Sequence, residues 1–165
     1  MYRKYESYFC SEADGLRISI MAMLPNEKPY RGVVQLVHGM SENKERYLPF
    51  MEYLAEAGYV AAIHDCRGHG KSVRSQGDLG YMYGGGAQAL VEDAHQITID
   101  LKEKWPNMPL ILFGHSMGSL VVRDYTREYD RDIDMLIVCG SPSKNNFLAM
   151  GKMIAAVQGK LFGKH

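Results

Sequence analysis

The sequence lacks the features that mark nucleic-acid-binding, secreted or membrane-spanning proteins. Its 19 basic residues balance its 19 acidic ones, and no basic run is interleaved with aromatic residues. The balanced net charge therefore does not indicate a nucleic acid or an anionic membrane as a partner. No apolar run approaches the roughly 20 residues of a membrane-spanning helix, and the N-terminal residues do not resemble a signal peptide. We expect a globular protein without an integral membrane segment.

Cysteine is also scarce. The three cysteines, Cys10, Cys66 and Cys139, are an odd number with wide spacing, which excludes a disulfide framework and shows no zinc-like pairing. We therefore expect a reduced, cytoplasmic protein with no bound metal. Cys139 ends an apolar run, and the pattern predicts that it is a small residue of the core.

Strand-like and helix-like segments alternate along the chain. Its 165 residues are enough for one good core. Period-two or continuous apolar patterns predict strands at 5–9, 16–24, 32–38, 59–64, 110–113 and 133–139. Helical spacing predicts helices at 46–57, 87–101, 120–129 and 147–161. Two early strands followed by strict alternation indicate an α/β fold: a mostly parallel sheet with helices on both faces.

The segment from Leu110 to Ser119 carries the strongest chemical signal. Four apolar strand residues run into Gly114-His115-Ser116-Met117-Gly118, and a helical pattern follows. A serine on such a strand-turn-helix connection is typical of a nucleophile, and the flanking glycines give a strained turn its room. The alternative is a small serine in a tight turn. As a nucleophile, Ser116 requires a histidine to take its proton and a carboxylate to orient that histidine.

Two backbone amides are candidates for an oxyanion hole. The N–H of Met117 follows Ser116 at a helix N-terminus, where donors are free and the dipole favours negative charge. The second donor is expected from the loop after the strand that ends at His38, and Met40, after Gly39, is the best placed. The alternative for His38-Gly39 is an ordinary strand-end turn.

Three motifs in order resemble one branch of a known superfamily. They are His38-Gly39-Met40-Ser41-Glu42, Asp65-x-Arg67-Gly68-His69-Gly70-x-Ser72, and the turn around Ser116. Together they resemble the monoacylglycerol lipase and lysophospholipase branch of the α/β-hydrolases. The resemblance implies a serine hydrolase of carboxylic esters, often of lipid-like alcohols, without a metal or organic cofactor. It assigns residues 1–142 to the N-terminal part of the hydrolase core, through about the sixth strand, and 143–165 to the start of a helical cap.

The resemblance also implies what the chain does not contain. In that family the triad acid and histidine come later than the sixth strand, so we expect both beyond residue 165. His38, His64, His69, His95, His115 and His165 are weaker candidates for the base: His38 is expected to shape the oxyanion loop, and His115 to point away from the Ser116 hydroxyl. The alternative function is a catalytically incomplete module that binds a partner, or one half of a split enzyme, with the exposed sheet edge recruiting a complementing half or a second copy.

The loop that contains Gly70-Lys71-Ser72 does not meet the requirements of a phosphate-binding P-loop. Gly70-Lys71-Ser72 matches the end of a P-loop, but the first glycine of that motif would fall at Asp65 and no helical pattern follows Ser72. Asp65, Arg67 and His69 are instead expected to brace their loop through hydrogen bonds.

Overall fold

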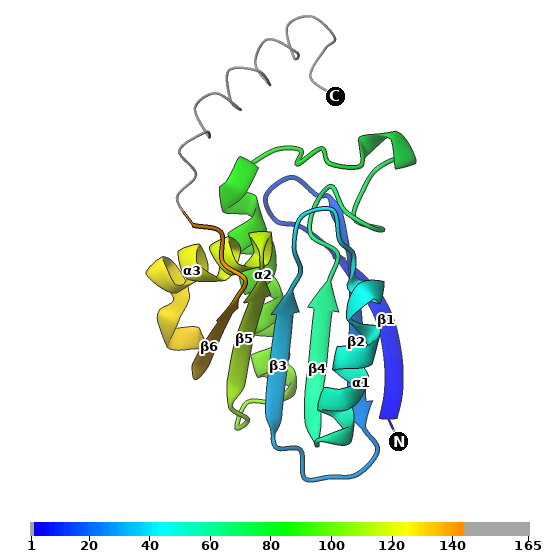
Figure 1. The fold of residues 1–165 in the computed structure, drawn as a ribbon, viewed down its shortest axis with the longest axis vertical. Helices are drawn as coiled ribbons and strands as arrows, with labels where there is room; N and C mark the ends of the chain where they lie inside the picture. The colour runs from blue at the N-terminus through cyan, green and yellow to red at the C-terminus, as the bar shows by residue number, and fades with distance from the viewer. Residues whose placement is uncertain (1, 144–165) are drawn as a thin grey trace, which may run out of the picture.

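Six strands form one sheet in the computed structural model, which describes residues 2–143 (Figure 1). The strands are β1 (Tyr2–Cys10), β2 (Arg17–Pro25), β3 (Gly32–Val37), β4 (Tyr59–His64), β5 (Leu110–His115) and β6 (Met135–Cys139). Their order is β1-β2-β4-β3-β5-β6. The pairs β1–β2 and β2–β4 are antiparallel, whereas β3 is parallel to β4 and β5, and β5 is parallel to β6. The expected mostly parallel α/β sheet is confirmed.

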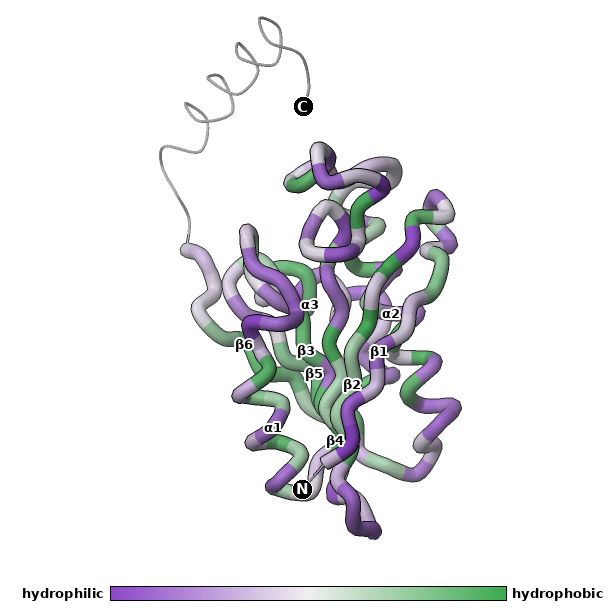
Figure 2. Tube along the Cα trace, turned by 90° about the vertical axis from the view of Figure 1, so that its right-hand side faces the viewer, coloured by the Kyte–Doolittle hydropathy of each residue, from purple (hydrophilic) through white to green (hydrophobic). Residues whose placement is uncertain are grey.

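The helices cover both faces of this sheet. They are α1 (Leu48–Glu56), α2 (Gly86–Lys104) and α3 (Met117–Tyr129), with short 3-10 turns η1 (Lys44–Tyr47), η2 (Gln76–Asp78) and η3 (Asp130–Asp132). Figure 2 shows α1 and α2 on opposite sides of the strands. Within the described residues, no helix is long and apolar enough to cross a membrane.

Alternating side chains of the central strands build two apolar layers. Val34 and Leu36 of β3 pack with Met51 and Ala55 of α1. Val33, the neighbour of Val34, packs on the other side with residues of α2 and β5. Every residue of β3 is buried, as its nearly all-apolar sequence predicts, and its one polar side chain, Gln35, donates to the Ala94 carbonyl at 2.7 Å.

The observed elements differ from the expected ones mainly at their ends. β1 begins at Tyr2 rather than residue 5, because its backbone pairs with β2 along its whole length while its side chains stay largely exposed. The helix expected at 46–57 divides into η1 and α1. α3 begins at Met117, directly after Ser116, three residues earlier than expected. The helix expected at 147–161 lies outside the described residues, as does nearly all of the proposed cap segment.

β6 forms one edge of the described sheet. It pairs with β5 alone among the described strands, and Met135, Ile137 and Val138 are 55%, 40% and 40% exposed. The expectation that Cys139 is a core residue is wrong: Cys139 is exposed, as are all residues of this edge strand except Leu136.

Candidate active site

Ser116 occupies a strained turn between β5 and α3. Its backbone angles are φ 51° and ψ −114°, although it carries a side chain. A conformation of this kind costs of order 1–3 kcal/mol and persists only where the surroundings enforce it. The Ser116 N–H donates a hydrogen bond to the Cys139 carbonyl at 3.0 Å. The turn is therefore fixed from β6 as well as from its own strand and helix.

Two glycines let the elements around Ser116 approach closely. A Cβ atom on Gly114 would stand 2.4 Å from the Gly118 carbonyl oxygen, and one on Gly118 would stand 2.1 Å from the Val37 carbonyl oxygen. Neither position accepts a larger residue without a shift of backbone. The Gly-x-Ser-x-Gly spacing is thus explained by packing of β5 and α3 against the end of β3.

The Ser116 hydroxyl makes no hydrogen bond to the described part of the chain. Within residues 2–143 it has no hydrogen-bond partner, whereas the Ser116 carbonyl accepts from the N–H of Ser119 at 3.0 Å and from its hydroxyl at 2.5 Å. Ser116 itself is partly exposed. A hydroxyl presented in this way is available to another group.

The loop after β3 lies against Ser116. A Cβ atom on Gly39 would stand 3.1 Å from the Ser116 Cβ atom. The Gly39 N–H donates to the Glu42 carboxylate at 2.8 Å, and within residues 2–143 the Met40 N–H has no acceptor. The Met117 N–H belongs to the first turn of α3, where an α-helix leaves its donors without internal partners.

A polar cluster links this loop to the residue before Ser116. Glu42 Oε2 accepts from the Tyr47 hydroxyl at 2.8 Å and lies 3.2 Å from His115 Nδ1, and the Tyr47 oxygen lies 3.0 Å from the same nitrogen. Because the single Tyr47 proton goes to Glu42, which as a carboxylate only accepts, His115 Nδ1 must be the donor. His115 Nδ1 is thereby engaged with Glu42 and Tyr47.

The charges of this cluster follow from its contacts. Burial of Glu42 raises the pKa of its carboxyl, but the hydrogen bonds from Tyr47, Gly39 and His115 outweigh burial and hold the pKa below its usual value. Burial and the adjacent Glu42 carboxylate raise the pKa of Tyr47. Arg46 Nε also lies 2.9 Å from Glu42 Oε1. Glu42 is therefore an ionised acceptor that ties the loop after β3 to the end of β5.

His38 joins the ends of β3 and β4. Its Nε2 accepts from the Cys66 N–H at 2.9 Å, and its Nδ1 donates to the Gly39 carbonyl at 2.7 Å. Burial lowers the pKa of His38. Since both ring nitrogens are engaged and the ring is held neutral, His38 shapes the loop and is not free to take a proton from Ser116.

The loop after β4 is braced by buried ion pairs. Asp65 and Lys44 are both fully buried, with Lys44 Nζ 2.8 Å from Asp65 Oδ2, and the same carboxylate accepts from the Lys71 N–H at 2.9 Å. A Cβ atom on Gly70 would overlap the Asp65 carboxylate at 2.3–2.5 Å. The backbone N–H groups here already surround a carboxylate of the protein itself, so they are not free to hold a phosphate, which agrees with the rejection of a P-loop.

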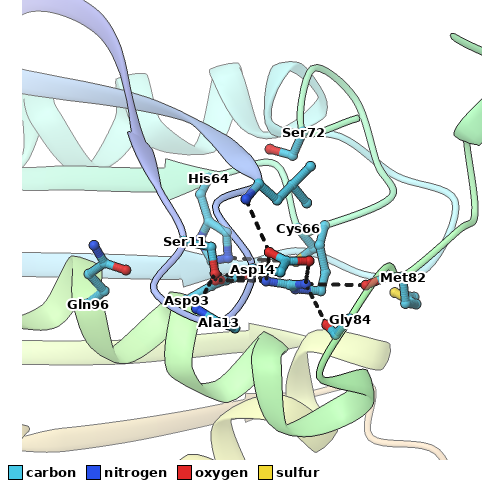
Figure 3. Close-up of polar contacts among 12 residues, drawn as sticks. Ser11, Ala13, Asp14, His64, Cys66, Ser72, Met82, Gly84, Asp93 and Gln96 are labelled. Carbon is cyan, nitrogen blue, oxygen red and sulfur yellow. Dashed lines mark hydrogen bonds and ion pairs between the residues drawn. The ribbon is translucent and has the colours of Figure 1, made fainter. Parts of the chain in front are cut away.

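Arg67 is the centre of a second buried network, and its partners Asp14, Gly84 and Asp93 are labelled in Figure 3. Its guanidinium group contacts the Asp93 carboxylate through Nε at 2.9 Å and through a second nitrogen at 3.1 Å. It also contacts Asp14 at 3.1 Å and the Gly84 carbonyl at 2.9 Å. Sequence reasoning expected Arg67 to brace its own loop. The structure adds that it connects the β1–β2 turn, α2 and the loop that precedes α2.

A cavity of about 630 Å³ opens beside the loop that follows β3. That loop and the loop that follows β4 form its walls. The lining residues are Met40, Ser41, Glu42, Asn43, Gly68, His69, Gly70, Gln76, Leu79, Gly80 and Met82. Within residues 2–143, no group of three or more His, Cys, Asp or Glu side chains is arranged to hold a metal ion.

Comparisons with known proteins agree with this fold. The family model described as serine aminopeptidase, S33, matches residues 28–165. A monoacylglycerol lipase of Mycolicibacterium smegmatis is 31% identical over 91% of the chain and 51% of its own length. The human monoglyceride lipase is 28% identical over 66% of the chain and 34% of its own length. The crystal structure of a thermostable carboxyl esterase from Bacillus coagulans superposes with a TM-score of 0.84 at 30% identity, covering 98% of this chain and 52% of that one.

The chain belongs to this S33 family of α/β-hydrolases, which includes relatives named as monoacylglycerol lipases. It spans about half the length, or less, of the relatives that it matches. The three motifs of the sequence therefore indicated the correct family.

Proposed function

We propose that this chain provides the nucleophile and the oxyanion hole of a serine hydrolase of carboxylic esters. Ser116 attacks the ester carbonyl carbon, and the N–H groups of Met40 and Met117 donate to the oxyanion that forms. A histidine and an acid from sequence beyond residue 165 complete the triad. The observation that carries the proposal is the positive φ of Ser116 in a turn that glycines and the β3 backbone enforce.

The proposed chemistry requires one base that acts twice. The histidine removes the proton from the Ser116 hydroxyl as the new C–O bond forms, and then gives that proton to the departing alcohol as the old C–O bond breaks. Water repeats the sequence on the acyl-enzyme and releases the carboxylic acid. His38 and His115 are poorly suited to this role, since His38 has both nitrogens engaged and His115 Nδ1 is held by Glu42 and Tyr47.

The names of the relatives favour fatty-acyl esters of glycerol as the substrate class. Monoacylglycerol lipase and carboxyl esterase are the names that the M. smegmatis and B. coagulans proteins carry. The exposed apolar side chains of Met40 and Leu79 at the cavity support a lipid-like substrate.

Labelling with a fluorophosphonate tests the nucleophile. The full chain is incubated with an alkyl fluorophosphonate, and the site of attachment is located by mass spectrometry. We expect label on Ser116, none on the Ser116→Ala variant, and unchanged labelling of Ser7→Ala, whose serine is exposed on β1. If Ser116 stays unlabelled while circular dichroism shows a folded chain, the turn is not reactive by itself, and the test is repeated on a chain extended beyond residue 165. Absence of label there as well refutes the proposal.

A second candidate function is supported by the β6 edge. Three of its apolar side chains are exposed, and such an edge pairs readily with another strand. We propose that this edge accepts a complementing segment or a second copy of the chain. Light scattering after size exclusion should show association of the chain with itself, and Ile137→Lys should reduce it. A monomer at all concentrations, with no binding of a co-expressed downstream segment, contradicts this proposal.

A further inference from the structure

The cavity beside the oxyanion loop contains one buried side chain with an unused hydrogen-bonding atom. Among the described lining residues, His69 alone has a side chain in the buried class, with 5% of the residue exposed. The cavity begins at Met40, the neighbour of Gly39, and Gly39 lies against Ser116. His69 therefore lines a space that starts next to the proposed reaction centre.

The contacts of His69 fix which nitrogen is free. Its Nδ1 lies 3.0 Å from the Arg67 carbonyl oxygen, which only accepts hydrogen bonds, so Nδ1 carries the proton. In the neutral ring Nε2 is then an acceptor. Within residues 2–143 Nε2 has no partner, yet it is not among the fully enclosed unpaired atoms, which are His64 Nδ1 and Tyr125 Oη. The nitrogen is therefore not fully enclosed, and the ring to which it belongs lines the cavity.

Two of the polar side chains that line the cavity with His69 are already engaged, and the other two, Ser41 and Gln76, are exposed. Glu42 accepts from Gly39, Tyr47 and Arg46, and the Asn43 side chain accepts from the Arg46 N–H. The exposed Met40 and Leu79 side chains and the half-buried Met82 add apolar surface. The cavity thus presents a buried acceptor within a mainly apolar wall.

Backbone contacts hold the two parts of the loop after β4 that line the cavity, residues 68–70 and 79–82, against each other. The Gly80 N–H donates to the Gly68 carbonyl at 2.7 Å, and a Cβ atom on Gly68 would stand 2.5 Å from the Tyr81 carbonyl oxygen. Arg67 also donates to the Met82 carbonyl at 3.3 Å. The wall opposite Met40 is therefore built by the protein around His69 and is not a chance opening between loops.

We propose that His69 Nε2 accepts a hydrogen bond from a hydroxyl group on the alcohol part of the ester substrate. This inference rests on the proposed ester hydrolase function. An acyl chain brings no donor and would leave the buried nitrogen unpaired, which costs binding affinity. A polyol ester supplies both parts, because its free hydroxyl reaches the nitrogen while its carbon atoms contact Met40, Leu79 and Met82. His69 would thus select esters whose alcohol keeps a free hydroxyl.

A titration followed by NMR tests this role without catalysis. The full chain, labelled with ¹⁵N in its histidine rings, is titrated at pH 8 with 1-O-butylglycerol, an ether that cannot be hydrolysed. We expect the His69 Nε2 signal to move. The His38 Nε2 signal should stay in place, because that atom already accepts from Cys66, and so should the signals of His95, which contacts Asp132 on α2's side of the sheet.

The matched ligand is the same ether with both hydroxyls methylated. We expect it to bind roughly five- to tenfold more weakly, as the loss of one hydrogen bond implies. His69→Phe, which keeps a ring of similar size, should bind both ethers alike, and the signals of His95, which contacts Asp132, report whether this variant is folded. Equal affinity of the two ethers for the wild-type chain overturns the proposal, as does a His69 Nε2 signal that neither ether moves.

The two proposals fail in different ways. Absence of Ser116 labelling in the extended chain as well, together with a normal titration, removes the nucleophile and leaves His69 as part of a diol-binding pocket. Normal Ser116 labelling with a silent His69 signal removes the role of His69 and leaves the hydrolase.

Discussion

The two sides of the candidate site differ in how their polar groups are paired. On the side of β3 and β4, Lys44 with Asp65 and Arg67 with Asp93 form ion pairs whose side chains are at most 1% exposed. On the side of β5 and β6, the Ser116 hydroxyl has no partner within residues 2–143, and apolar side chains of β6 are exposed. The comparison indicates that ion pairs brace the loops around the proposed nucleophile while its hydroxyl is left open, as preorganised sites require.

Removing Arg67 should have the largest effect on the paired side. Arg67→Met leaves the Asp93 carboxylate buried without its counter-ion, and we expect a loss of about 3–5 kcal/mol in the free energy of unfolding. Urea denaturation followed by circular dichroism measures it. The matched control is Arg127→Met, whose side chain is 79% exposed and whose ion pair with Asp124 contributes at most about 1 kcal/mol. Similar losses for both variants would contradict the distinction.

Sequence reasoning found the strands and missed this network for a physical reason. The nearly continuous apolar run of β3 indicates burial on both faces, and that of β5 accompanies one buried and one partly buried face, so both strands could be located from the sequence alone. Arg67 lies 26 residues from Asp93 and 53 from Asp14. No local periodicity joins such positions. Lys44 likewise reads as a surface lysine in a polar loop, and only the fold places it against Asp65.

The candidate site was predictable to a similar degree. Spacing and context indicated Ser116 because a strand, two glycines and a helix are local features of the sequence. The contact of Tyr47 with His115 spans 68 residues and depends on η1 packing across the end of β5. His69 appeared in a motif, but its tautomer follows from the Arg67 carbonyl, which a sequence does not position.

Acid should weaken the paired side through His64. This histidine is fully buried, and burial lowers its pKa from 6.5 to about 3. Below pH 6.5 the unfolded chain takes up a proton that the folded chain does not, so stability is lost as pH falls, by up to about 1.4 kcal/mol per pH unit. Between pH 8 and pH 5 we expect the wild-type chain to lose about 2 kcal/mol more than His64→Leu in urea denaturation. Equal losses would show that His64 is not the group responsible.

Glu42 connects the two sides, and its replacement should therefore slow the proposed chemistry. Glu42→Gln removes the charge that holds the Gly39 N–H, the Tyr47 hydroxyl and His115 Nδ1. We expect the rate of fluorophosphonate labelling at Ser116 to fall roughly tenfold, equivalent to about 1.4 kcal/mol, because the Met40 amide is less well positioned. Glu56→Gln, at the exposed end of α1, is the control and should label at the wild-type rate. A normal rate for Glu42→Gln would mean that the loop is positioned without it.

The smallest effect is expected on the exposed side, at Ile137 of β6. Its side chain is 40% exposed, and Thr has the same branching at Cβ and a similar preference for strands. We expect Ile137→Thr to change the free energy of unfolding of the monomeric chain by no more than about 0.5 kcal/mol, the usual limit for surface substitutions. The fully buried Val33 of β3 provides the contrast, since Val33→Thr places a hydroxyl among apolar side chains and should cost about 1–3 kcal/mol. Parallel urea denaturation of the two variants, at concentrations where light scattering shows a monomer, makes the measurement. If Ile137→Thr costs as much as Val33→Thr, β6 contributes to the core of the described chain, and the contrast between a closed side and an open side does not hold.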